Sequence, residues 1–172
     1  MGRSLRAAAP LAITVALVAP TASAQEIAVR RRVGLGAVVG FPDNGVSFNY
    51  FFSQRVSLQA DAGFHAGYEW LGFGVRVDAL FWMPRLKDLG WSDLVWYFGP
   101  GGRVGFRSSG GHPARTDTVG VGAEFLFGIG FQWHRAPIEL LIDGGPVLNL
   151  IDPSGNNRVF SGTAALRFRY YF

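Results

Sequence analysis

Apolar and polar residues alternate with a period of two along most of the chain after residue 32. Eight segments show the pattern, at 33–41, 46–52, 56–67, 72–81, 94–106, 119–133, 138–150 and 160–172. A period of two places successive side chains on opposite faces of a β-strand. The alternation therefore predicts eight strands, each with an apolar face and a face of polar residues and glycine.

Turn-forming residues separate the eight segments. The connections at 42–45, 68–71, 108–117 and 152–158 are expected at one end of the fold, and those at 53–55, 83–93 and 134–137 at the other. Asn-Gly at 44–45 is a strong hairpin signal. The connection 83–93 is long, and we interpret residues 86–89 as a candidate turn of helix. Trp82, Trp91 and Trp96 nearby fit an aromatic girdle.

Strand number and strand length together predict the fold class. Tilted strands of about 9–11 residues span a bilayer, and an even number brings both chain ends to one side. We predict an all-β fold, an eight-stranded antiparallel up-and-down transmembrane β-barrel. A soluble lipocalin-type barrel would alternate in the same way with its apolar face inward. Charged residues make up only 16% of the chain, and Lys87 is the sole lysine, so we favour the apolar face outward.

The first 24 residues have the pattern of a secretory signal peptide. Arg3 and Arg6 precede an apolar run at 7–20, and an A-x-A site ends at Ala24. We expect cleavage there, which divides the chain into a signal peptide (1–24) and a barrel domain (25–172). Fourteen of the 16 Lys and Arg and all 12 Asp and Glu would remain, a formal charge of about +2 that gives little reason to expect nucleic acid. We interpret the basic triplet 30–32 as a solvated lead-in.

Six of the predicted strands carry charged residues on the polar face, and taken together these charges are of both signs. If the apolar face points outward, these side chains fill the bore, where an unpaired charge is costly. The functional alternative is an ion path or gate, but the bore of an eight-stranded barrel is about filled by its own side chains. We favour an interior plug that fixes register. The predicted network comprises Asp61, Arg76, Asp78, Arg103, Arg107, Glu124, Glu139, Asp143, Arg167 and Arg169.

No motif of catalysis or cofactor binding emerges from the sequence. The absence of cysteine excludes disulfides, thiolate zinc sites and cysteine nucleophiles. Glycines at 34, 36 and 40 and at 99, 101 and 105 lack nucleotide-loop spacing and follow the strand period. His65, His112 and His134 are scattered, without the local His-x-Ser arrangement of outer-membrane lipid A deacylases. We expect no catalytic residues, metal or cofactor, and rank a lipid A-modifying enzyme last among the functions considered.

The second half of the chain contains four characteristic strings: WYFGPGGRVGF at 96–106, PIELLI at 137–142, PVLNL at 146–150 and RYYF at 169–172. With these strings the chain resembles small bacterial outer-membrane β-barrel proteins of the OmpA/OmpX type. The resemblance implies insertion by the outer-membrane barrel assembly machinery, which reads the terminal strand. Phe168, Tyr170 and Phe172 stand where that signal expects aromatics. It implies no catalytic residues to transfer.

The sequence thus predicts location and shape more sharply than activity. We expect a monomer in the cell outer membrane of a Gram-negative bacterium, in contact with outer-membrane lipid and lipopolysaccharide. Its expected role is structural, or one of surface interaction through its loops. The alternative is a small channel or a carrier of a hydrophobic ligand.

Overall fold

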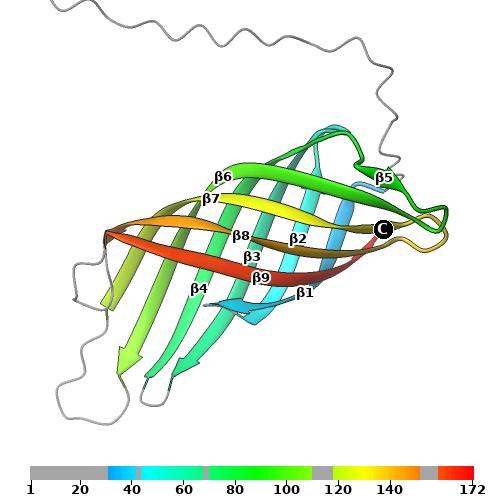
Figure 1. Ribbon diagram of the computed structural model, residues 1–172. Helices are drawn as coiled ribbons and strands as arrows, with labels where there is room; N and C mark the ends of the chain where they lie inside the picture. The colour runs from blue at the N-terminus through cyan, green and yellow to red at the C-terminus, as the bar shows by residue number, and fades with distance from the viewer. Residues whose placement is uncertain (1–30, 42–43, 68–69, 110–117, 152–158) are drawn as a thin grey trace, which may run out of the picture.

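A computed structural model describes residues 31–41, 44–67, 70–109, 118–151 and 159–172, of which 65–67, 70–71 and 107–109 are described by their backbone only. The described chain forms a closed antiparallel β-barrel (Figure 1). Its strands are β1 (Val33–Phe41), β2 (Asn44–Phe51), β3 (Val56–Gly67), β4 (Trp70–Trp82), β5 (Lys87–Asp88), β6 (Ser92–Ser109), β7 (Thr118–Trp133), β8 (Ile138–Ile151) and β9 (Phe160–Tyr171).

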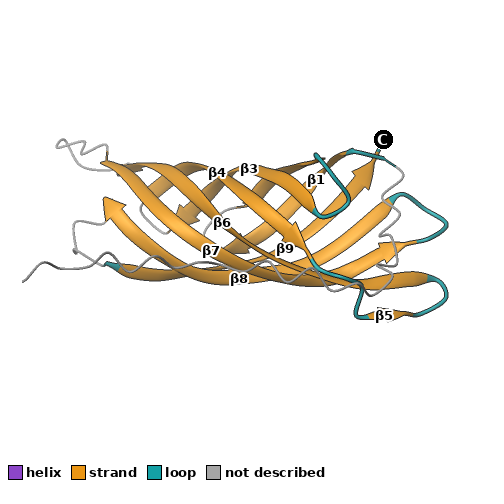
Figure 2. Ribbon diagram, turned by 90° about the horizontal axis from the view of Figure 1, so that it is seen from above, coloured by secondary structure: helices purple, strands orange, loops and turns teal. Residues whose placement is uncertain are grey.

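All strands except β5 form the barrel wall, so eight strands close the ring as the alternation predicts. Each pairs with its neighbours in the chain, and two further pairings, β1 with β9 and β4 with β6, complete the circle. Gly34 lies opposite Tyr171 at the β1–β9 seam. The strands tilt around the long axis (Figure 2). We call the end with the connections 52–55, 83–91 and 134–137 the turn end, and the opposite end the loop end.

Two predictions of local secondary structure were wrong. Residues 44–45 are not part of a turn, because Asn44 and Gly45 already pair with Phe64 and Gly63 in β2. The segment 86–89 is not helical, because Lys87 and Asp88 pair with Leu94 and Asp93 as the short strand β5. Gly90 lies in the tight return between β5 and β6 with φ of 80°, a conformation that glycine adopts without steric strain.

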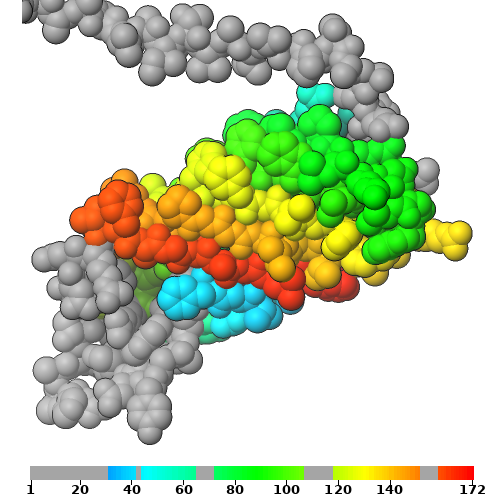
Figure 3. All heavy atoms as spheres, in the orientation of Figure 1, coloured from blue at the N-terminus to red at the C-terminus, as the bar shows by residue number. Residues whose placement is uncertain are grey.

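Bulky apolar side chains cover the outside of the barrel. They include Leu35, Val39, Val46, Phe64, Val77, Phe106, Phe127, Ile129, Ile142, Leu166 and Phe168, all at least one third exposed. In the space-filling view, strands β6 to β9 and β1 form a continuous outer wall (Figure 3). The apolar face predicted from the alternation therefore points outward, which excludes the lipocalin-type arrangement.

A cluster of apolar and aromatic side chains fills the bore near the turn end. It contains Phe51, Leu80, Trp82, Val95, Tyr97, Leu141 and Tyr171. Trp82 packs between Phe51 and Tyr97, with ring centroids 5.2 and 4.7 Å away. Trp82 is only 1% exposed, so its assignment to an outer girdle was wrong; Trp91, by contrast, is 52% exposed.

Residues 1–30, which include the predicted signal peptide, lie outside the described part of the structure. Within the described part, no helix is long and apolar enough to cross a membrane.

Candidate functional site

The most unusual feature of the barrel is a polar interior within an apolar wall. Buried polar side chains come from every wall strand except β1, which contributes Gly34, Gly36, Val38 and Gly40 instead. The buried polar residues are Ser47, Asn49, Ser57, Gln59, Asp61, Arg76, Asp78, Ser92, Glu124, Glu139, Asp143, Thr163, Arg167 and Arg169. Because β1 presents mainly glycine inward, the long arginines of its neighbour β9 have room to cross the bore.

Arg169 joins three strands near the turn end. Its guanidinium donates to Ser47 Oγ at 3.0 Å and to Glu139 Oε1 at 3.1 Å, and it also donates to Gln59 Oε1. Glu139 accepts two more hydrogen bonds, from Tyr171 Oη at 3.0 Å and from Gln132 Nε2 at 2.7 Å. The Arg169–Glu139 ion pair is fully buried, and its hydrogen bonds offset the desolvation of both charges.

Asp61 pairs with two arginines in the middle of the bore. Its Oδ2 accepts from Arg76 Nη2 at 2.5 Å and from Arg167 Nη2 at 2.8 Å. Arg76 lies opposite Asp61 on the neighbouring strand β4, but Arg167 reaches it across the bore from β9. This carboxylate therefore ties two sides of the barrel together.

Arg76 also faces two further carboxylates, those of Asp78 and Glu124. Its Nε lies 3.4 Å from Asp78 Oδ2 and 3.7 Å from Glu124 Oε1. Directly opposite Arg76 in the register stands Arg103 of β6. Like charges in such positions repel one another, and the neighbouring carboxylates compensate for this repulsion. Gln59 links this group to the Arg169 group, because its Nε2 donates to Asp78 Oδ2 at 3.0 Å.

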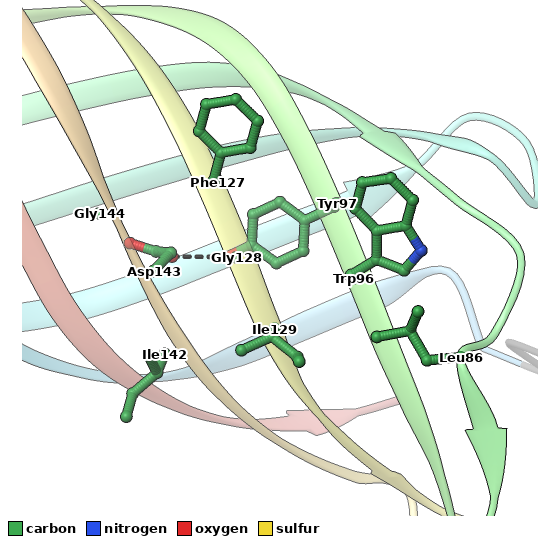
Figure 4. Close-up of a pocket in the computed structure, with 9 residues that line it drawn as sticks. All are labelled: Leu86, Trp96, Tyr97, Phe127, Gly128, Ile129, Ile142, Asp143 and Gly144. Atoms are coloured by element: carbon green, nitrogen blue, oxygen red, sulfur yellow. Dashed lines mark hydrogen bonds between the residues drawn. The ribbon is translucent and has the colours of Figure 1, made fainter.

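Asp143 connects the charged groups to the aromatic cluster. Its carboxylate pairs with Arg167 and accepts a hydrogen bond from Tyr97 Oη at 2.5 Å. The Tyr97 ring lies against the backbone of Gly128, where an added Cβ would meet the ring carbon Cζ at 2.2 Å. A larger residue at 128 would displace the ring, so glycine allows the Tyr97–Asp143 contact. Figure 4 shows this contact behind the strand wall.

The outside of the same wall carries an apolar groove. Its volume is about 600 Å³, and its lining includes Leu86, Trp96, Phe127, Ile129 and Ile142 (Figure 4). Gly144, which has no side chain to fill the space, also lines it. The groove runs along the apolar outer face from the β4–β6 connection toward mid-strand.

The structure brings together eight of the ten residues predicted for the interior network. Arg103 is half-buried beside Glu124, whereas the side chain of Arg107 lies outside the described part. The predicted network did not include the uncharged partners, which share the inward parity of the charges: Ser47, Asn49, Gln59, Tyr97, Thr163 and Tyr171. The predicted assembly aromatics Phe168, Tyr170 and Phe172 lie on the outer face, all more than 40% exposed.

A second polar cluster lies at the turn end, outside the bore. His134 Nε2 is 3.1 Å from Asp93 Oδ1, and His134 Nδ1 is 3.1 Å from the Gly90 carbonyl oxygen. Both ring nitrogens thus face acceptors, and the hydrogen bond to Asp93, followed by that to Gly90, raises the pKa of His134. The cluster links the β5–β6 hairpin to the β7–β8 connection.

Asp88, Asp93 and His134 also present ligand atoms within 4.8 Å of one another. Arg85 Nη1, however, donates to Asp88 at 3.2 Å and to Asp93 at 3.0 Å. A guanidinium already compensates both carboxylates, so the arrangement is that of an ion-pair cluster rather than an open set of metal ligands. The side chains of His65 and His112 lie outside the described part.

Comparisons with protein-family models, with curated proteins and with solved structures find no match to this chain. The interior of the described barrel is arranged to neutralise charge and to join strands across the bore.

Proposed function

We propose that the protein is a bacterial outer-membrane β-barrel with a structural or surface-interaction role. One observation carries the proposal: the barrel has an apolar outside and a charged, hydrogen-bonded inside. A barrel folded in water has the opposite distribution, whereas a barrel in lipid needs an apolar surface and a closed ring of backbone hydrogen bonds.

The extent of the outer apolar surface supports a lipid environment. Exposed large apolar side chains occur on every wall strand, among them Val39, Phe64, Val77 and Ile142. Soluble monomers rarely expose a contiguous apolar patch of more than a few hundred Å². The bilayer hydrocarbon and the lipid portion of lipopolysaccharide are therefore the proposed partners of this surface. Insertion by the barrel assembly machinery, through β9 and the Phe172 that follows it, remains part of the proposal.

The filled bore favours this role over a channel or carrier. Trp82, Tyr97 and Arg169 are each buried to 1% exposure or less, in the turn half of the interior. An eight-stranded ring has little space beyond its own side chains. We expect the mature protein to show no steady conductance in planar bilayers, and we expect no hydrophobic ligand to co-purify with it. A steady conductance or a co-purifying ligand would favour the channel or carrier alternative.

Membrane insertion is tested by placing a charge on the outer face at two depths. Leu166→Arg, at mid-strand in β9, should destabilise the barrel in lipid vesicles by about 2–4 kcal/mol, because a cation at the bilayer midplane is poorly solvated. Phe160→Arg, at the loop end of the same strand, should cost about 0–1 kcal/mol. The measurement is reversible urea unfolding, monitored by tryptophan fluorescence.

Two results would contradict the proposal. One is equal destabilisation by the two arginine variants, since a lipid environment requires depth dependence. The other is a mature chain, made without residues 1–24, that stays folded, soluble and monomeric without detergent.

A further inference from the structure

A pocket of about 570 Å³ lies at the turn end, where β2 connects to β3. It is lined by Arg32, Phe51, Phe52, Ser53, Gln54 and Arg55. This pocket is separate from the polar interior, and its two arginines were interpreted from sequence only as a solvated lead-in residue and a turn residue.

The lining offers hydrogen-bond donors and positive charge. Arg32 and Arg55 are both exposed, and none of the described residues that line the pocket is a carboxylate. Ser53 Oγ already accepts hydrogen bonds from the backbone nitrogens of Arg55 and Val56, at 3.3 and 3.1 Å, so its hydroxyl hydrogen is free to be donated. Two guanidiniums beside a hydroxyl and an amide match the oxygens and charge of a phosphate group.

Backbone hydrogen bonds hold the two arginines at fixed positions. The Arg32 carbonyl accepts from Phe51 N at 2.9 Å, and the Arg55 carbonyl accepts from Trp82 N at 2.8 Å. Their Cα positions are therefore set by β2 and β4, and binding needs to order only the side chains. This lowers the entropic cost of holding an anion between them.

The pocket also has an apolar side that continues onto the outer wall. Phe52 is 59% exposed, and its ring packs edge-on against Tyr50 with centroids 5.1 Å apart. Phe51, in contrast, is 2% exposed and belongs to the aromatic cluster in the bore. The pocket thus lies on the rim, with cationic groups beside a strip of outward-facing aromatic surface.

We propose that this rim pocket binds the phosphate group of a membrane phospholipid. The phosphate lies between Arg32 and Arg55, and the acyl chains follow Tyr50 and Phe52 along the outer wall. The lipid part of this inference rests on the proposed membrane location, whereas phosphate recognition rests on the pocket alone.

The test is a titration of mature protein in dodecyl maltoside micelles with dihexanoyl phosphatidylglycerol, followed by phosphorus NMR. We expect saturable binding that weakens as salt is raised. Arg32→Gln and Arg55→Gln should each weaken binding about tenfold, through loss of one charge-assisted contact, and the double variant about a hundredfold. Arg135→Gln, an exposed arginine at the same end but outside the pocket, is the matched control and should stay within about twofold of wild type.

A parallel titration with inorganic phosphate separates the two sources of the same chemistry. Tighter binding of the phospholipid, by tenfold or more, supports the proposal. Equal binding of both probes overturns its lipid part. Absence of saturable binding of either probe, or equal weakening by Arg135→Gln, overturns the pocket as a phosphate site. If the protein proved soluble without detergent, the membrane proposal would fail. Titration with inorganic phosphate in plain buffer would still test whether the pocket binds phosphate.

Discussion

The two halves of the barrel interior differ in the size of the side chains that point inward. In the turn half, large side chains such as Trp82, Tyr97, Leu141 and Arg169 are almost wholly buried. In the loop half, the inward positions are mostly glycine, including Gly40, Gly45, Gly74, Gly105 and Gly122, and Arg103 there is only half-buried. The halves share the same eight wall strands, and apart from a register shift at Val121 and Gly122 in the β7–β8 pairing they differ mainly in their side chains.

This contrast indicates where the stability of the barrel is concentrated. A buried charge with hydrogen-bonded partners cannot lose one of them without leaving the others unpaired. Arg169 has three such partners, on β2, β3 and β8. The turn half should therefore respond strongly to substitution and the loop half weakly.

The largest effect is expected from removing the buried arginine of the turn half. Arg169→Met leaves Glu139 buried without its cation, which should destabilise the protein by about 3–5 kcal/mol. Arg103→Met, in the loop half, should cost less than about 1 kcal/mol, because solvent screens a half-exposed charge. Urea unfolding midpoints in detergent micelles compare the two. Similar losses for both variants would remove the proposed distinction between the halves.

A matched pair of glycine substitutions tests the same contrast without changing charge. Gly128→Ala places a methyl group 2.2 Å from the Tyr97 ring, whereas at Gly105 the nearest atom to an added Cβ is 4.0 Å away. Gly128→Ala should destabilise the barrel by about 1–3 kcal/mol through overpacking. Gly105→Ala should be neutral, or stabilise by up to about 1 kcal/mol by restricting the unfolded chain. Equal midpoints in urea would contradict the close packing around Tyr97.

The strands and their facing could be predicted from the sequence because both follow from local alternation. Asp61, Arg76 and Asp78 were placed inside by parity alone, and the structure puts them there. Partners across the bore could not be predicted in this way. Arg167 of β9 meets Asp61 of β3, residues brought together only when the ring closes.

The failures have similarly specific causes. Trp82 has the inward parity of Asp78 and Leu80, but its aromatic character suggested the membrane interface. The segment 86–89 has no strand alternation of its own, and β5 exists because it pairs with β6. The membrane location and the assembly role of Phe168, Tyr170 and Phe172 remain predictions.

An effect smaller than that of Arg169→Met is also expected from single hydrogen bonds in the two halves. Tyr97→Phe removes the donor to Asp143, a bond of 2.5 Å between buried groups. It should cost about 1.5–3 kcal/mol, as for hydrogen bonds to charged groups. Ser161→Ala removes an exposed contact to Asn149 at 3.1 Å, and water can replace it, so about 0.5 kcal/mol or less is expected. A larger loss for Ser161→Ala in urea unfolding would reverse the order of the two halves.

The smallest expected effect lies outside the bore, at His134, and depends on pH. Its pKa is raised above the ordinary value of 6.5, mainly by the hydrogen bond to Asp93. The folded state therefore binds the proton more tightly than the unfolded state does. The stabilisation is complete below the unfolded-state pKa and is lost as the pH rises through the folded-state pKa. The urea midpoint of the wild type should accordingly fall modestly as the pH is raised from below 6.5.

His134→Gln should remove that slope without changing the Arg169→Met effect, because the cluster at the turn end is separate from the interior network. A slope that persists in His134→Gln would assign the pH dependence to another group.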